Sequence, residues 1–152
     1  MAPIEDEKSD LYRDHLDSEE PREAVLMKAR NYAATGTVVH AADALATSLY
    51  LLAELPSLCM LHEDTFVDVE ELGAAQVRIG TIDDDDALIS QSQATENVIT
   101  PIAQGDANHG LRLWQVLGLA EDPGGNIGLY MHLIADATGA GSVKFRFSYL
   151  WN

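Results

Sequence analysis

The sequence predicts an all-β protein: an antiparallel β-sandwich or jelly-roll-like domain, preceded by an acidic N-terminal arm with a short helix. From residue 31 onward, apolar and polar residues alternate in several runs with the period of two that half-buried strands show. Clusters of glycine, proline and aspartate separate these runs, as turns do in sandwiches and barrels. The chain has 152 residues, which is enough for one domain with a sizeable core.

Residues 1–30 form the predicted arm. The stretch "SEEPREAVLMKAR" suits a short helix, with Ser18 as the N-cap, Pro21 in the first turn and basic residues at the end. Its apolar residues are too few for a core helix, so we expect it to pack on its own domain or on a neighbour. Leu26 and Met27 are therefore candidate interface residues.

Residues 31–152 form the predicted β-sandwich domain. Strands are expected in "SLYLLAEL", "TFVDVEEL", "AAQVRIG", "NIGLYMHLIAD" and "SVKFRFSYL". The residues expected to share the buried face of each strand are Leu49, Leu51, Ala53 and Leu55; Val67 and Val69; Ala75, Val77 and Ile79; Ile127, Leu129, Met131 and Leu133; and Val143, Phe145, Phe147 and Tyr149. The stretch "LRLWQVLGLA" fits either a further strand or a short helix. Residues 95–110 are expected to form a long loop with one short strand.

The charge balance is strongly acidic. Twenty-five acidic residues face nine basic ones, for a net charge of −16. Such a field repels phosphate backbones and anionic lipids, so we expect neither nucleic-acid nor membrane binding. No apolar run approaches the roughly 20 residues of a membrane span, and the acidic N-terminus is unlike a secretory signal. We therefore expect the protein to be made in a cytoplasm and to dock onto a basic surface.

No residue pattern predicts an enzyme. The single cysteine, Cys59, lies in an apolar stretch and is interpreted as a buried thiol. The five histidines lack the spacing of a metal or cupin site. The glycine-rich stretches "DPGGNIG" and "ATGAGS" do not match phosphate-binding motifs and are interpreted as turns. We therefore expect no catalytic residue and no cofactor.

Four consecutive aspartates, Asp83, Asp84, Asp85 and Asp86, follow the strand "AAQVRIG". A dedicated calcium loop places carboxylates at alternate positions, with a glycine for the turn and a closing glutamate. Neither the glycine nor the glutamate is present. The run is interpreted as a solvated hairpin or corner, and calcium binding by these four carboxylates is the weaker alternative.

The aromatic residues Trp114, Trp151, Tyr130 and Tyr149 could form a platform for sugar binding, but they are widely spread along the chain. A core or a subunit interface is the preferred interpretation. His132 shares the polar face of its strand with Tyr130. The interface candidates in the domain are therefore Tyr130, His132, Tyr149 and Trp151.

Three stretches, "TVVHAADALATSLYLLAELP", "VRIGTIDDDDALI" and "SVKFRFSYLW", together resemble small virion structural proteins of tailed bacteriophages. These are capsid decoration (cement) or other head-associated proteins. The resemblance carries no active-site residues. It implies a non-enzymatic protein that binds the outer head lattice and stabilises it, with the major capsid protein and its own copies as partners.

The same resemblance implies that the protein resides in the virion, after synthesis in the host cytoplasm, as a homo-oligomer with a trimer favoured. A head–tail connector or tail structural protein is the nearer alternative. A carbohydrate-binding or cupin-like β-sandwich protein is the alternative from another class.

Overall fold

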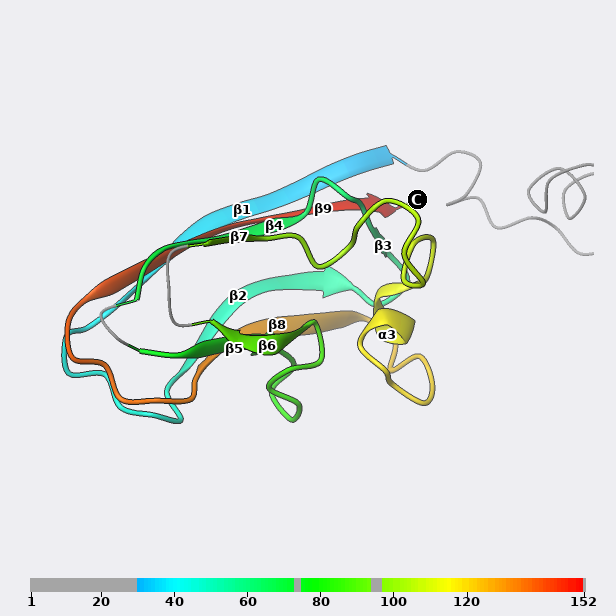
Figure 1. Ribbon diagram of the computed structural model, residues 1–152. Coiled ribbons are helices and arrows are strands. Elements are labelled where there is room, and N and C mark those ends of the chain that lie inside the picture. Colours follow the sequence, from blue (N-terminus) through cyan, green and yellow to red (C-terminus); the bar gives the residue numbers. More distant parts are fainter. Residues whose placement is uncertain (1–29, 73–74, 94–96, 152) are drawn as a thin grey trace, which may run out of the picture.

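The computed structural model describes residues 30–72, 75–93 and 97–151. Two antiparallel sheets lie one above the other, as the prediction of an all-β fold requires (Figure 1). Sheet A contains β1 (Arg30–His40), β9 (Gly141–Trp151), β4 (Phe66–Glu71) and β7 (Asn97–Ile99), in that order, with β3 (Met60–Leu61) paired to the end of β9. Sheet B contains β2 (Leu49–Pro56), β8 (Asn126–Leu133), β5 (Val77–Gly80) and β6 (Ile89–Gln93), in that order. The predicted arm, with Leu26 and Met27, lies outside the described residues except for Arg30, which begins β1.

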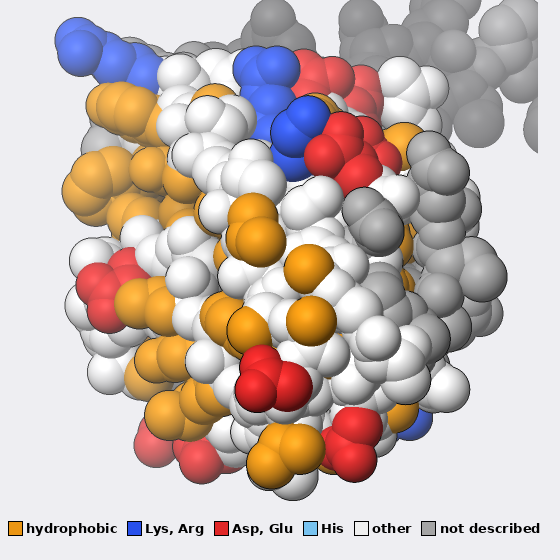
Figure 2. Space-filling model, turned by 90° about the vertical axis from the view of Figure 1, so that its left-hand side faces the viewer, with side chains coloured by type: hydrophobic (Ala, Val, Ile, Leu, Met, Phe, Trp, Pro, Cys, Tyr) orange, Lys and Arg blue, Asp and Glu red, His pale blue; other side chains and the backbone are white. Residues whose placement is uncertain are grey.

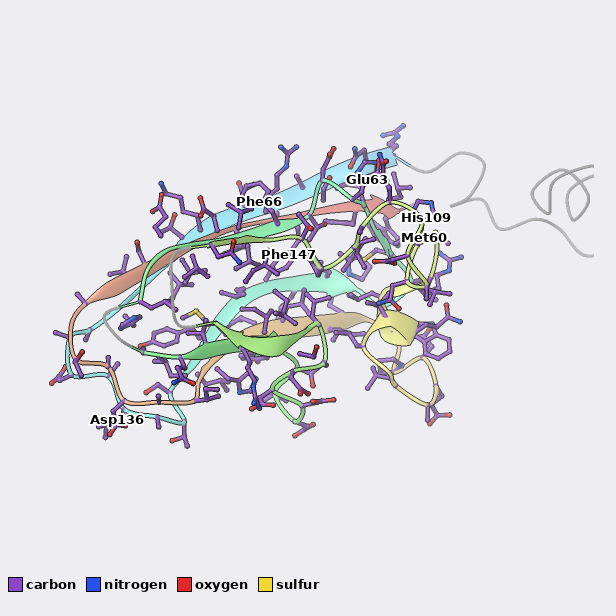
Figure 3. The ribbon with its side chains drawn as sticks, viewed as in Figure 1. Met60, Glu63, Phe66, His109, Asp136 and Phe147 are labelled. Atoms are coloured by element: carbon purple, nitrogen blue, oxygen red, sulfur yellow. The ribbon has the colours of Figure 1, made fainter. Side chains whose placement is uncertain are left out.

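The core fills the space between the sheets, and the predicted alternation holds in three of the five runs and in β9 as far as Phe147, beyond which Ser148 is buried and Tyr149 only half-buried. Phe147 points into this space (Figure 3) and is fully buried, as are Val67 and Val69 on the neighbouring strand β4. The other alternating residues that are buried are Ala75, Val77, Ile79, Ile127, Leu129, Met131, Leu133, Val143 and Phe145. Complete burial of one such side chain stabilises the fold by roughly 1.5–3 kcal/mol.

Strand β2 departs from its predicted pattern. Its pairing with β8 shifts between Leu51 and Ala53, so that Leu52 is an extra residue in a β-bulge. One extra residue moves the side chains before it to the opposite face. Leu49 and Leu51 are therefore 40% and 50% exposed, whereas Leu55 is buried. The prediction that these leucines share one face was wrong.

The stretch that fitted either a strand or a helix forms a single helical turn, α3 (Leu113–Val116). The backbone N–H of Leu113 donates to the carbonyl oxygen of Cys59 at 2.8 Å, which fixes the turn to the segment after β2. Leu113 and Leu117, four residues apart, are both buried. Cys59 is buried as predicted, and burial raises the pKa of its thiol to about 12.

The order of the strands defines two ends and two edges of the molecule. Strands β1 and β2 are terminal strands of their sheets and approach each other, so they form one edge. At one end, β1 begins where β9 finishes, since Arg30 pairs with Trp151, and α3 lies at the same end (Figure 1). The predicted short strand in residues 95–110 is β7, which pairs with β4.

Candidate interaction surfaces

The four aspartates belong to the loop between β5 and β6, which folds back over the outer face of sheet B. The backbone N–H of Thr81 donates to the carbonyl oxygen of Asp84 at 2.8 Å, and the hydroxyl of Thr81 accepts from the N–H of Asp84. The loop lies so close to the sheet that a Cβ on Gly80 would be 2.0 Å from the carbonyl oxygen of Asp84. Glycine at position 80 therefore permits the approach.

An ion pair with β5 and a hydrogen bond within the loop offset the repulsion between the carboxylates. The guanidinium of Arg78 pairs with Asp85 at 3.3 Å. The protonated carboxyl of Asp86 donates a hydrogen bond to Asp84, which raises the pKa of Asp86, and the neighbouring negative charges add to this shift. Asp83 and Asp84 are exposed, as expected for a solvated corner. Carboxylate oxygens of Asp84, Asp85 and Asp86 lie within 4.8 Å of one another and could hold a cation, and Asp83 is not part of this group.

Tyr130 and His132 lie on the outer face of β8, as predicted, but they differ in availability. The Nε2 of His132 donates to the carbonyl oxygen of Thr81 at 2.6 Å, so the aspartate loop occupies this side chain. Tyr130 is partly exposed, and its pairing partner on the neighbouring strand β2 is the outward-facing Leu51. Of the two, Tyr130 is the residue that continues an apolar surface.

The large exposed aliphatic side chains of the edge strands β1 and β2 and of their connection are Val39, Leu45, Leu49 and Leu51, here together called the apolar edge. Their exposed fractions are 67%, 65%, 40% and 50%. They belong to β1, to β2 and to the segment that joins these two strands. Figure 2 views the end of the molecule that carries this segment and shows hydrophobic side chains gathered along one side. Exposed apolar surface of this kind marks contact sites in soluble proteins.

The outer face of sheet A carries a shallow groove of about 390 Å³, bordered by Thr35, Thr37, Phe66, Asp68 and Lys144. Phe66 lies on this outer side, opposite the direction of Phe147 (Figure 3). The ammonium of Lys144 lies 2.7 Å from the carboxylate of Glu70, and this hydrogen-bonded ion pair raises the pKa of the lysine. Because Glu70 balances its positive charge, Lys144 does not make the groove a binding site for anions.

Three aromatic residues meet at the end of the molecule where β1 begins and β9 finishes. The ring of Tyr32 stacks on that of Tyr149, with centroids 5.7 Å apart, and meets Trp151 edge-on at 6.3 Å. Tyr149 and Trp151 were predicted interface residues. Tyr32 was missed, because only the register between β1 and β9 brings it beside them. Trp114 packs against the core, and Tyr130 lies on the other sheet.

A pocket of about 240 Å³ adjoins Trp151, between the segment from Pro56 to Leu58 and the turn from Asp122 to Asn126. The backbone N–H of Ser57 donates to the carbonyl oxygen of Gly125 at 2.9 Å, which holds the two walls together. A hydrogen bond from the Ser57 hydroxyl lowers the pKa of Asp122, aided by the N–H of Gly124 and by the positive charge of Arg112.

His132 contacts the aspartate loop, whereas His62 and His40 have other partners. His62 lies 3.4 Å from Asp64, and His40 is buried with its Nδ1 near the carbonyl oxygen of Ala41. Within residues 30–72, 75–93 and 97–151, the three loop carboxylates form the one group of three or more metal-ligating side chains. None of the helices in these ranges has the length and hydropathy to span a membrane.

Comparison with known proteins gives a likeness in fold. No protein-family model and no curated protein sequence matches the chain. Among solved structures, a chain described as "Cyanophage Pam1 capsid asymmetric unit" superposes with a TM-score of 0.52 at 12% sequence identity. The match covers 82% of this chain and 86% of that chain. At this identity the likeness shows a shared fold.

Proposed function

We propose that the chain is a non-enzymatic virion structural protein of a bacteriophage, which decorates the outer head lattice and stabilises it. The observation that carries the proposal is the likeness in fold to a chain of a phage capsid over 82% of the length. The sequence stretches that resemble small virion proteins support the proposal independently of the fold. Under this proposal the protein is made in the host cytoplasm and resides in the virion.

A decoration protein needs contacts between its own copies, and the apolar edge is suited to them. Its four residues carry no charge, whereas the whole chain carries −16 and would otherwise repel a second copy. Closed symmetric association would bury Leu49, Leu51 and Leu45 against equivalent residues or a neighbouring surface. We favour a trimer, as the resemblance to cement proteins implies.

Contact with the lattice is assigned to the acidic exterior. Surfaces of opposite charge attract each other and determine the orientation of the complex. The exposed carboxylates of Asp83 and Asp84, on a loop that Arg78 and Gly80 hold against the sheet, are available for such contacts. The expected partner is the major capsid protein, through basic patches on its outer surface.

The test is to add the purified protein to expanded capsids that lack it and to measure co-sedimentation. We expect saturable binding that weakens as salt rises, since salt screens contacts between exposed charges. An unrelated protein of similar size and net charge is the control for non-specific attraction. The proposal fails if the protein does not sediment with capsids even at low salt.

Copy number distinguishes a decoration protein from a connector or tail component. A protein spread over the head lattice is expected in hundreds of copies per virion, whereas a connector occupies a single ring. Quantitative mass spectrometry of purified virions measures this number. A count that fits one ring would remove the protein from the head surface.

A further inference from the structure

The pocket beside Trp151 is not used by the proposed contacts between copies or with the lattice. One wall is apolar and consists of Trp151, Pro56 and Leu58. The opposite wall is the polar turn that includes Asp122 and Asn126. Binding sites for small molecules share this combination of an apolar or aromatic surface with a few polar groups that fix orientation.

The aromatic wall is held in place before any ligand arrives. Tyr32 contacts the edge of Trp151 and is itself stacked on Tyr149, so the indole is supported by two further rings. Even so, Trp151 remains 40% exposed. An aromatic face is negatively polarised and attracts the weakly positive C–H groups of an apolar ring surface. One face of a pyranose ring presents such C–H groups.

The polar wall offers donors and acceptors that match sugar hydroxyls. Asn126 is exposed, and its side-chain amide makes no hydrogen bond with another described residue, so it can both donate and accept. The carboxylate of Asp122 is ionised at neutral pH, as an ordinary aspartate is, and hydrogen bonds from Ser57 and Gly124 hold it in place as an acceptor. Its charge, with the net charge of −16, disfavours anionic sugars.

The size of the pocket limits the ligand. Its 240 Å³ is below the roughly 300–1,000 Å³ of sites that take drug-sized molecules. We propose that the pocket beside Trp151 binds one neutral pyranose ring, between the indole and the turn that carries Asp122 and Asn126. This function is additional to the proposed role in the head and does not depend on it.

Nuclear magnetic resonance of the full chain tests the proposal. Glucose, galactose, mannose and N-acetylglucosamine are titrated separately while the indole N–H signals of the two tryptophans are followed. At least one of these sugars is expected to shift the Trp151 signal saturably and to leave the Trp114 signal in place. A small ligand in an open pocket implies a dissociation constant of roughly 1–10 mM.

Three variants assign the site. Asn126→Ala and Trp151→Ala are each expected to weaken sugar binding at least about tenfold. Because Trp151→Ala lacks the indole signal, binding to this variant is followed through the backbone amide signal of Gly125. Val98→Ala truncates an exposed side chain on β7 and is expected to leave the affinity unchanged. Asn126→Ala also keeps the aromatic cluster, so it separates loss of binding from loss of folding.

The proposal is overturned if none of the four sugars gives a saturable shift at Trp151. It is also overturned if Asn126→Ala and Trp151→Ala bind as the unmodified chain does. A peptide of residues 1–29 is the competing occupant, because the chain enters β1 at Arg30, the pairing partner of Trp151. Saturation of the Trp151 signal by this peptide, with no effect of any sugar, would assign the pocket to the arm instead.

Discussion

Gly80 shows how one residue determines the form of the aspartate loop. The loop returns across the sheet at a distance that leaves no room for a Cβ at this position. Arg78 on β5, two residues before Gly80, then forms an ion pair with Asp85 of this loop. The sequence predicted that the aspartates lie at a solvated corner, but it could not predict the return over the sheet. That return depends on backbone atoms of Asp84 and Ala87 meeting Gly80.

Gly80→Ala is expected to displace the loop. The added methyl group would overlap the carbonyl oxygen of Asp84, and overpacking of this kind costs about 1–3 kcal/mol of unfolding free energy. Urea denaturation measures this loss, and changes in the amide signals of residues 81–88 would locate it. Gly105→Ala is not a suitable control, because its φ is positive, so Ser90→Ala in β6 is used. An unchanged loop and stability would show that the loop is not packed on Gly80.

The pair Asp84 and Asp86 provides a prediction for pH. The pKa of Asp86 is raised in the folded chain by the hydrogen bond that its protonated carboxyl donates to Asp84. Because the pKa of Asp86 is higher in the folded than in the unfolded chain, the proton shared with Asp84 stabilises the fold at low pH. This stabilisation is lost as the pH rises through the folded-state pKa of Asp86. Asp84→Asn is expected to lower the pKa of Asp86 towards its usual value. A carboxyl carbon titration by nuclear magnetic resonance checks this, and an unchanged pKa would contradict the contact.

At the scale of strands, the period of two predicted the buried faces of β4, β5, β8 and most of β9. It succeeded because one side of each strand faces a single core. It failed in β2, where the bulge at Leu52 reverses the face of Leu49 and Leu51. A bulge arises from pairing with β8, which no local pattern contains. The meeting of Tyr32 with Trp151 likewise depends on the register between distant strands.

Phe147→Ala tests the packing of the two sheets. Phe147 is fully buried on β9, with its ring centroid 5.2 Å from that of Phe145. Removal of a buried phenylalanine ring costs about 3–5 kcal/mol of unfolding free energy, because a cavity is left between the sheets. Urea denaturation with linear extrapolation measures the loss. Val98→Ala, at an exposed position, should stay within about 0.5 kcal/mol. A loss below about 1 kcal/mol for Phe147→Ala would contradict its place in the core.

At the scale of the whole molecule, a strongly acidic net charge is combined with the exposed residues of the apolar edge. The net charge of −16 favours solubility and docking on basic surfaces, whereas Val39, Leu45, Leu49 and Leu51 favour contact with another apolar surface. The acidity could be predicted from composition alone. The apolar edge could not, because it requires β1 and β2 to lie on the same side and the bulge to turn two leucines outward.

Leu51→Asp is expected to separate copies of the chain. A buried carboxylate in a contact between acidic molecules is strongly unfavourable. Sedimentation velocity should show an oligomer for the unmodified chain and a monomer for Leu51→Asp. Val98→Asp adds the same charge at an exposed position on β7 and should remain an oligomer. A monomeric unmodified chain, or a Leu51→Asp variant that still associates, would exclude the apolar edge as the contact.

The most direct test of the role in the head is the heat stability of capsids. Expanded heads that lack the protein are heated with and without a saturating amount of it, and disruption is followed by calorimetry or by release of packaged DNA. A protein that binds the intact lattice stabilises it by mass action, so heads with the protein should be disrupted at a higher temperature. Disruption at the same temperature with and without the protein would contradict its function as a stabilising decoration protein.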